Sequence, residues 1–82
     1  MDINIKTKYN IGDTVYIPEC YEEFFPSKPF KVTGVLMKVS TNTTLIQYQL
    51  QSNEYEETVA EQQVFSTYED CTKWCNNHNN NS

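Results

Sequence analysis

Three side chains near the end of the sequence could bind a metal ion. Cys71, Cys75 and His78 stand at positions i, i+4 and i+7, which share one face of an α-helix. With Cys20 as a fourth ligand, three thiolates and one imidazole would complete a tetrahedral zinc site. However, C-x3-C-x2-H is not a familiar zinc-binding spacing, and no second close pair of cysteines is present. The pattern gives zinc only weak support.

The same residues have a simpler interpretation as the buried stripe of a short helix. Tyr68, Cys71, Trp74 and Cys75 follow one another at spacings of three, three and one, as on the apolar face of an amphipathic helix. Free cysteine behaves as a small buried hydrophobic residue. We therefore predict buried structural thiols, no metal or other cofactor, and an exposed His78.

Catalysis of other kinds has little support in the sequence. A Cys–His pair on one helix lacks the oxyanion hole and the pocket that nucleophilic catalysis requires. The chain has only two glycines, so it offers no glycine-rich loop for phosphate. We predict that the protein is not an enzyme.

The residues around these candidates predict a few short strands and one helix. The predicted strands cover residues 14–17, 30–39, 44–52 and 55–61, and the helix starts at a capping box formed by Ser66 and Glu69 and ends at 76–77. In the second strand the apolar side chains change faces at Gly34, which is typical of a bulge or a bend. In the third strand Ile46, Tyr48 and Leu50 share the predicted buried face.

The segment ECYEEFFPSKP, residues 19–29, follows neither the helical nor the strand period. It contains two prolines and three glutamates, which predicts a long loop. Phe24 and Phe25 within it are candidates for exposed aromatic anchors that contact a partner. The alternative is that one or both fold over the open end of the sheet.

The charge of −5 is unevenly distributed along the chain. Residues 1–40 hold five lysines and five acids, whereas residues 41–82 hold one lysine and six acids. The chain has no arginine and no basic cluster, which argues against direct nucleic-acid binding. The six acidic side chains of the second half are Glu54, Glu56, Glu57, Glu61, Glu69 and Asp70. They form either a solvated surface or a surface that binds a basic protein partner; alternation along the strand prevents all six from sharing one patch.

Length and composition predict one folded domain in a reducing compartment. The chain has 82 residues, of which 38% are hydrophobic and 13% aromatic. We divide it into an N-terminal arm (1–8), one domain (9–78) and a disordered tail (79–82). The first residues lack a signal peptide and no segment reaches membrane-spanning length, which predicts a cytoplasmic protein. An odd number of cysteines agrees with reduced thiols.

These elements predict a mainly β fold, a small, partly open antiparallel barrel with one C-terminal helix. The residues that carry a family resemblance are Tyr9, Ile11–Asp13, Val15–Ile17, Gly34–Val35, Tyr48, Leu50, Val64–Phe65, Thr67 and Glu69. In this pattern the chain resembles small SH3-like barrel proteins, which are often encoded by phages and mobile elements. The resemblance implies that Val64 and Phe65 dock the final helix, and it implies no catalytic residue.

The same resemblance implies a function in binding other proteins. Small acidic phage proteins often bind and inhibit host defence proteins, as anti-CRISPR inhibitors do, which would place this chain in the host cytoplasm. We therefore expect a non-catalytic binding module that inhibits a basic, nucleic-acid-handling host protein. The alternatives are a structural or homo-oligomeric accessory protein of a phage, and a small zinc or thiol protein.

Overall fold

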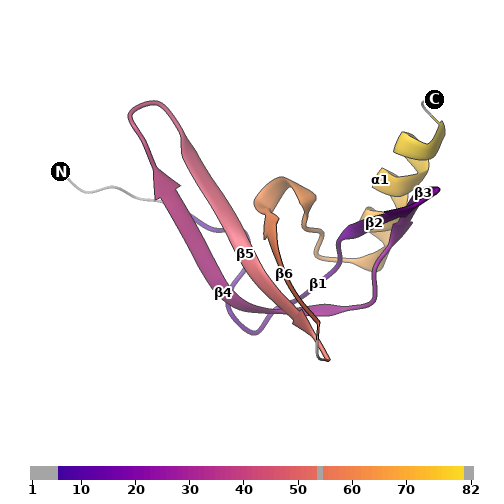
Figure 1. Ribbon diagram of the computed structural model, residues 1–82, viewed down its shortest axis with the longest axis horizontal. Helices are drawn as coiled ribbons and strands as arrows, with labels where there is room; N and C mark the ends of the chain where they lie inside the picture. Colours follow the sequence, from indigo (N-terminus) through magenta and orange to yellow (C-terminus); the bar gives the residue numbers. More distant parts are fainter. Residues whose placement is uncertain (1–5, 54, 81–82) are drawn as a thin grey trace.

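The computed structural model describes residues 6–53 and 55–80, which form a curled sheet and a smaller hairpin–helix unit (Figure 1). The elements are β1 (Thr14–Val15), β2 (Pro18–Tyr21), β3 (Glu23–Pro26), β4 (Phe30–Val39), β5 (Thr44–Ser52), β6 (Tyr55–Ala60), the 3₁₀ turn η1 (Glu61–Gln63) and α1 (Tyr68–Asn80). β1, β4, β5 and β6 form a four-stranded antiparallel half-barrel sheet in that order, and β2 and β3 form a separate two-stranded sheet. The predicted mainly β fold, a partly open antiparallel barrel with one C-terminal helix, is confirmed.

The long strand β4 bends at the predicted glycine. β4 and β5 pair up to Val39↔Thr44, and their register shifts between Val32 and Gly34. The shift changes which residues face inward: Val32 is buried before it, and Val35 packs against the core after it. A Cβ atom at Gly34 would collide with the side-chain amide of Gln49. The bulge therefore lets one strand serve two parts of the curled sheet.

The core lies on the concave face of this sheet. Its buried members are Val15, Ile17, Phe30, Val32, Tyr48, Leu50 and Val64. Tyr48 and Leu50 confirm the predicted buried face of β5, and Ile46 is half-buried at its rim. Among the core residues, the aromatic rings of Phe30 and Tyr48 supply much of the apolar area that this small chain can bury.

The first strand starts after a tight turn and is shorter than predicted. Asn10 and Asp13 close the turn through Asp13 N to Asn10 O at 3.0 Å and Asn10 N to Asp13 Oδ2 at 2.8 Å. Gly12 within it has φ of 98°, a backbone conformation that favours glycine. β1 then ends at Val15, and Tyr16 forms an isolated bridge with Phe65.

The segment 19–29, predicted to be a long loop, instead contains most of the β2–β3 hairpin. Pro18 pairs with Pro26, so Pro18 begins this hairpin and does not simply end the preceding strand. Proline is tolerated here because both strands of a two-stranded hairpin are edge strands. Glu22 at the tip has φ of 66°, and buried Ser27 closes the base by accepting a hydrogen bond from Ile17 N at 3.0 Å.

The helix α1 starts one residue later than predicted. Thr67 is its N-cap, because the N–H of Asp70 donates to Thr67 Oγ1 at 3.1 Å. The Ser66–Glu69 capping box is therefore replaced by a Thr67–Asp70 contact. Serine and threonine are both suitable N-cap residues, so from the sequence alone the helix could begin after either Ser66 or Thr67.

The helix also continues further than predicted, to Asn80. The side-chain amide of Asn79 donates to the carbonyl of Phe24 at 2.8 Å and accepts from its N–H at 2.7 Å. These two bonds hold the last turn against β3, so residues 79 and 80 belong to the helix, and only 81–82 of the predicted tail lie outside the described residues.

α1 covers the hairpin more than it covers the mouth of the half-barrel. It contacts mainly β3 and also β2, as Figure 1 shows. In the part of the chain that the structure describes, no helix is long and apolar enough to cross a membrane.

Candidate functional site

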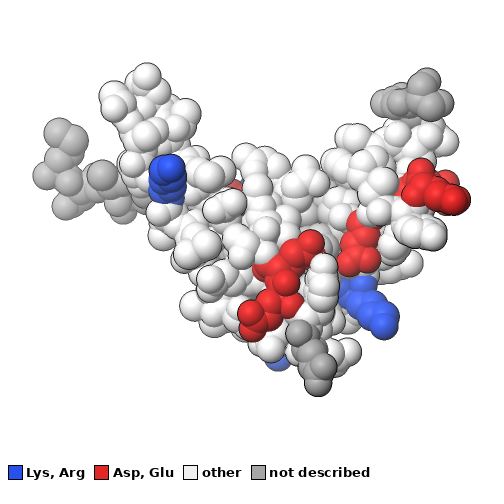
Figure 2. All heavy atoms as spheres, in the orientation of Figure 1, with Lys and Arg blue, Asp and Glu red and all other residues white. Residues whose placement is uncertain are grey.

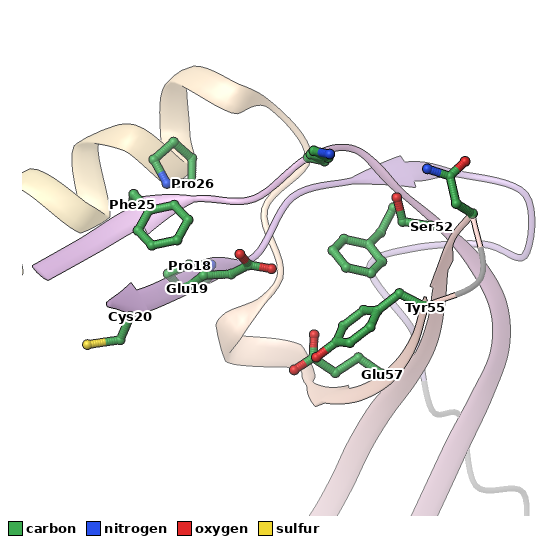
Figure 3. A pocket seen from close by; sticks show the side chains of 11 residues that line it. Pro18, Glu19, Cys20, Phe25, Pro26, Ser52, Tyr55 and Glu57 are labelled. Carbon is green, nitrogen blue, oxygen red and sulfur yellow. The ribbon is translucent and has the colours of Figure 1, made fainter. Parts of the chain in front are cut away.

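A cleft of about 890 Å³ separates the hairpin from the turn end of the sheet (Figure 3). Buried Phe30 forms part of its lining, and its ring centroid lies 6.3 Å from that of Tyr55. The cleft thus lies where the two parts of the fold meet, and both contribute walls.

Each wall carries one exposed aromatic ring and one carboxylate. Glu19 and Phe25 are directly paired in the hairpin, so they share one face of it. Tyr55 and Glu57 are two residues apart on β6 and share one face of that strand. Phe25 is 41% exposed and Tyr55 58% exposed. In Figure 3 the Glu19 carboxylate and the Tyr55 ring point into the space between the walls.

The cleft is acidic on balance among the described residues that line it. Glu19 and Glu57 face one lysine, Lys28. In the view of Figure 2, acidic side chains lie near the centre of the molecule and on its right-hand arm. The left-hand arm, which is the β4–β5 hairpin of Figure 1, shows no acidic side chain in this view. A cationic side chain would therefore find carboxylates and aromatic faces together in the cleft.

The structure distributes the predicted acidic residues over several surfaces. Glu57 lines the cleft, and Glu56 and Glu57 both line a smaller hollow of about 320 Å³ beside Thr33. Glu69 and Asp70 are exposed in the first turn of α1, where carboxylates complement the helix dipole. Glu54 lies outside the described residues. A role for these side chains in partner binding stays a prediction.

The Glu61 carboxylate accepts hydrogen bonds from within the molecule. Its Oε2 atom accepts from the Tyr48 hydroxyl at 2.5 Å and from Lys8 N at 3.2 Å. The Tyr48 hydroxyl in turn accepts from Lys8 N at 3.0 Å and from Tyr9 N at 3.2 Å. Burial, reinforced by the bond to Glu61, raises the pKa of Tyr48 above its usual value. This network attaches residues 8–9 to the core.

The two phenylalanines of the hairpin have different surroundings. Phe24 packs edge-to-face on Trp74 with ring centroids 5.0 Å apart, on the side of the hairpin that α1 covers. His78 stacks on the same indole at 3.6 Å, with Nδ1 2.8 Å from Trp74 O. Phe24 is thus part of the hairpin–helix contact, and of the two predicted anchors only Phe25 lines the cleft.

The three cysteines and His78 do not converge on one site. Cys71 and Cys75 are buried on α1, as predicted, while Cys20 is exposed on β2 and His78 is exposed. Within residues 6–53 and 55–80, no three His, Cys, Asp or Glu side chains are placed to hold one ion. Burial, followed by the neighbouring Cys75, raises the pKa of Cys71 from 9.0 to about 12, and burial also raises that of Cys75. Neutral thiols are weak metal ligands and weak nucleophiles.

Sequence reasoning missed Glu19 and Tyr55 as candidate site residues. The alternation of β6 already places Tyr55 and Glu57 on one face, so the sequence could have predicted the β6 wall of the cleft. Glu19 becomes a neighbour of Phe25 only through the hairpin register, which a loop interpretation hides. Comparison with protein-family models, curated proteins and solved structures gives no match to this chain.

Proposed function

We propose that this protein is a non-catalytic binding module whose cleft receives a basic segment of a partner protein. The observation that supports the proposal is the pairing of an exposed aromatic ring with a carboxylate on each wall: Phe25 with Glu19, and Tyr55 with Glu57. Exposed aromatic side chains that project into a concave site are typical binding anchors.

The chemistry of the walls favours lysine or arginine as the central contact. The aliphatic stem of such a side chain can lie along the Phe25 and Tyr55 rings while its charged head reaches a carboxylate. A cation over an aromatic ring contributes about 0.5–2 kcal/mol, more when water is excluded. The described residues that line the cleft include two carboxylates and one lysine. Their net negative charge attracts the positively charged end of a lysine or arginine side chain.

The narrower form of the proposal concerns the class of partner. A resemblance to small SH3-like phage proteins, together with the net charge of −5, favours inhibition of a basic, nucleic-acid-handling host protein, as in anti-defence proteins. Nucleic-acid-binding proteins present the lysine- and arginine-rich surfaces that this cleft would fit.

A displayed random-peptide library selected on the purified protein tests the cleft. We expect the selected peptides to be enriched in lysine and arginine, and their affinity to fall when salt rises from about 50 mM to about 300 mM. The variant Glu19→Gln/Glu57→Gln should lose about tenfold or more in affinity for the best peptide. Phe25→Ala should lose a similar amount.

A charge-matched variant, Glu69→Gln/Asp70→Asn, separates the cleft from the general acidic charge. It should retain affinity within about threefold. Equal losses in the two double variants would show that charge alone attracts the peptides, and selection of peptides without basic residues would contradict the cleft chemistry. For the narrower form, capture from host lysate should yield a nucleic-acid-handling protein that the cleft variant no longer retains.

A further inference from the structure

The outer edge of β4 lacks a strand partner over most of its length in the described part of the chain. β1 pairs with β4 only at Phe30 and Lys31, and backbone bonds with residues 12 and 13 extend the contact to Val32. Residues 33–39 continue beyond this point, with β5 along their other edge. Alternate backbone N–H and C=O groups along 33–39 therefore face an edge open to another strand.

This edge carries few of the features that usually prevent strand addition. Natural edge strands are short or carry prolines, several charges or a covering loop. Residues 33–39, TGVLMKV, have no proline and one charge, Lys38. Leu36 is 42% exposed, Met37 51% and Val39 50%. The segment is long, extended and apolar, and in Figure 1 it lies on an arm that projects from the rest of the molecule.

A second copy of the chain suits this edge because the strand is complementary to itself. In an antiparallel register centred on Leu36, the two Leu36 side chains face each other. Gly34 then faces Lys38 of the second copy, and Val35 faces its Met37. Cross-strand pairs of this kind stabilise a sheet.

The charges agree with the same register. The sequence has no Asp or Glu between Glu23 and Glu54, so two β4 edges approach without opposing carboxylates. In the Leu36-centred register the two Lys38 side chains are offset by four residues, about 13 Å along the strand. That separation exceeds the screening length of about 10 Å at 0.1 M salt, so their repulsion is small.

We infer that two copies of this chain associate through their β4 edges, antiparallel and centred on Leu36, which joins two half-barrel sheets into one. The inference does not depend on the cleft, which lies between the hairpin and the turn end of β5 and β6. One strand edge gives a small interface, so the dimer is weak and concentration-dependent.

Sedimentation equilibrium from about 10 µM to about 1 mM tests the association. The wild-type protein should pass from monomer towards dimer over this range. Leu36→Lys places two lysines opposite each other and should weaken dimerisation about tenfold or more. The matched control is Leu45→Lys on β5, because Leu45 is also 42% exposed on the same arm. It lies one strand away from the edge and should weaken dimerisation less than about threefold.

Disulfide trapping tests the register in a Cys20→Ser background. Leu36→Cys should form a covalent dimer when two thiols are oxidised by diamide, because facing Cα atoms lie within about 7 Å. Leu45→Cys should not, because three strand spacings, together with the offset along the strands, would hold the pair more than about 14 Å apart. A monomer throughout the concentration range, equal weakening by the two lysine variants, or equal trapping at the two cysteines would each overturn the inference.

Discussion

The two thiols of α1 show how position in the fold decides the behaviour of a residue type. Cys71 is completely buried and Cys75 almost so, while Cys20 of the same chain is exposed on an edge strand. Burial disfavours the thiolate, so the two helical cysteines act as small apolar side chains and only Cys20 has the accessibility of a reactive thiol.

Thiol reactivity should divide the cysteines in the same way. In the folded protein near neutral pH we expect iodoacetamide to modify Cys20 and to leave Cys71 and Cys75 unmodified until the chain is unfolded in urea. Peptide mass spectrometry after timed labelling measures each site. Labelling of Cys71 in the folded state at the rate of Cys20 would contradict its burial.

The raised pKa of Cys71 also gives stability a definite pH dependence. The unfolded thiol ionises near 9.0, whereas the folded one stays protonated to about 12. Between these values the folded state binds more protons, so the free energy of unfolding should fall as pH rises from 9 towards 12. Urea unfolding at pH 8, 9 and 10 measures the decline, and a Cys71→Ala variant should show a shallower one.

At the scale of elements, the start of α1 depends on one hydroxyl group. Thr67→Ala removes the acceptor for Asp70 N and should lower the free energy of unfolding by about 1 kcal/mol. Ser66→Ala is the matched control and should change it by less than about 0.5 kcal/mol. Urea denaturation of both variants distinguishes the two residues, and a larger loss for Ser66→Ala would restore the capping box that the sequence suggests.

The elements that sequence reasoning predicted correctly are those with a local physical signal. Gly34 marked the bulge because the apolar side chains visibly change faces there, and the alternation of β5 marked its buried side. The β2–β3 hairpin gave no such signal. Its prolines are normally evidence against strands, and they fit here because, within the described residues, each strand of this two-stranded sheet is an edge strand.

At the scale of the whole molecule, the Tyr48 hydroxyl connects distant parts of the chain to the core. Tyr48→Phe leaves Tyr9 N and the Glu61 carboxylate without that partner, and should cost about 1–3 kcal/mol of stability. Hydrogen exchange at the Tyr9 amide should accelerate at the same time. Tyr55→Phe, which removes an exposed hydroxyl, should change stability by less than about 0.5 kcal/mol.

The candidate site could be predicted only in part, because its two walls come from segments that are far apart in the sequence. The cleft joins β6 to a hairpin far earlier in the sequence, since Tyr55 follows Phe25 by 30 residues, and only the folded chain brings these positions together. Phe25 and Glu57 were identifiable by residue type. Phe24 has the same type and the neighbouring position, yet strand alternation turns it towards Trp74.

The contact between Asn79 and Phe24 has a consequence for the order in which the protein is made. The two residues are 55 positions apart, so the hairpin is synthesised long before the helix that covers it. Until α1 has left the ribosome, Phe24 has neither the amide of Asn79 beside its backbone nor the indole of Trp74 beside its ring. All four half-barrel strands precede α1 in the chain: β1 lies before the hairpin, and β4, β5 and β6 follow it. The sheet can therefore close first, and the hairpin–helix unit must be completed last.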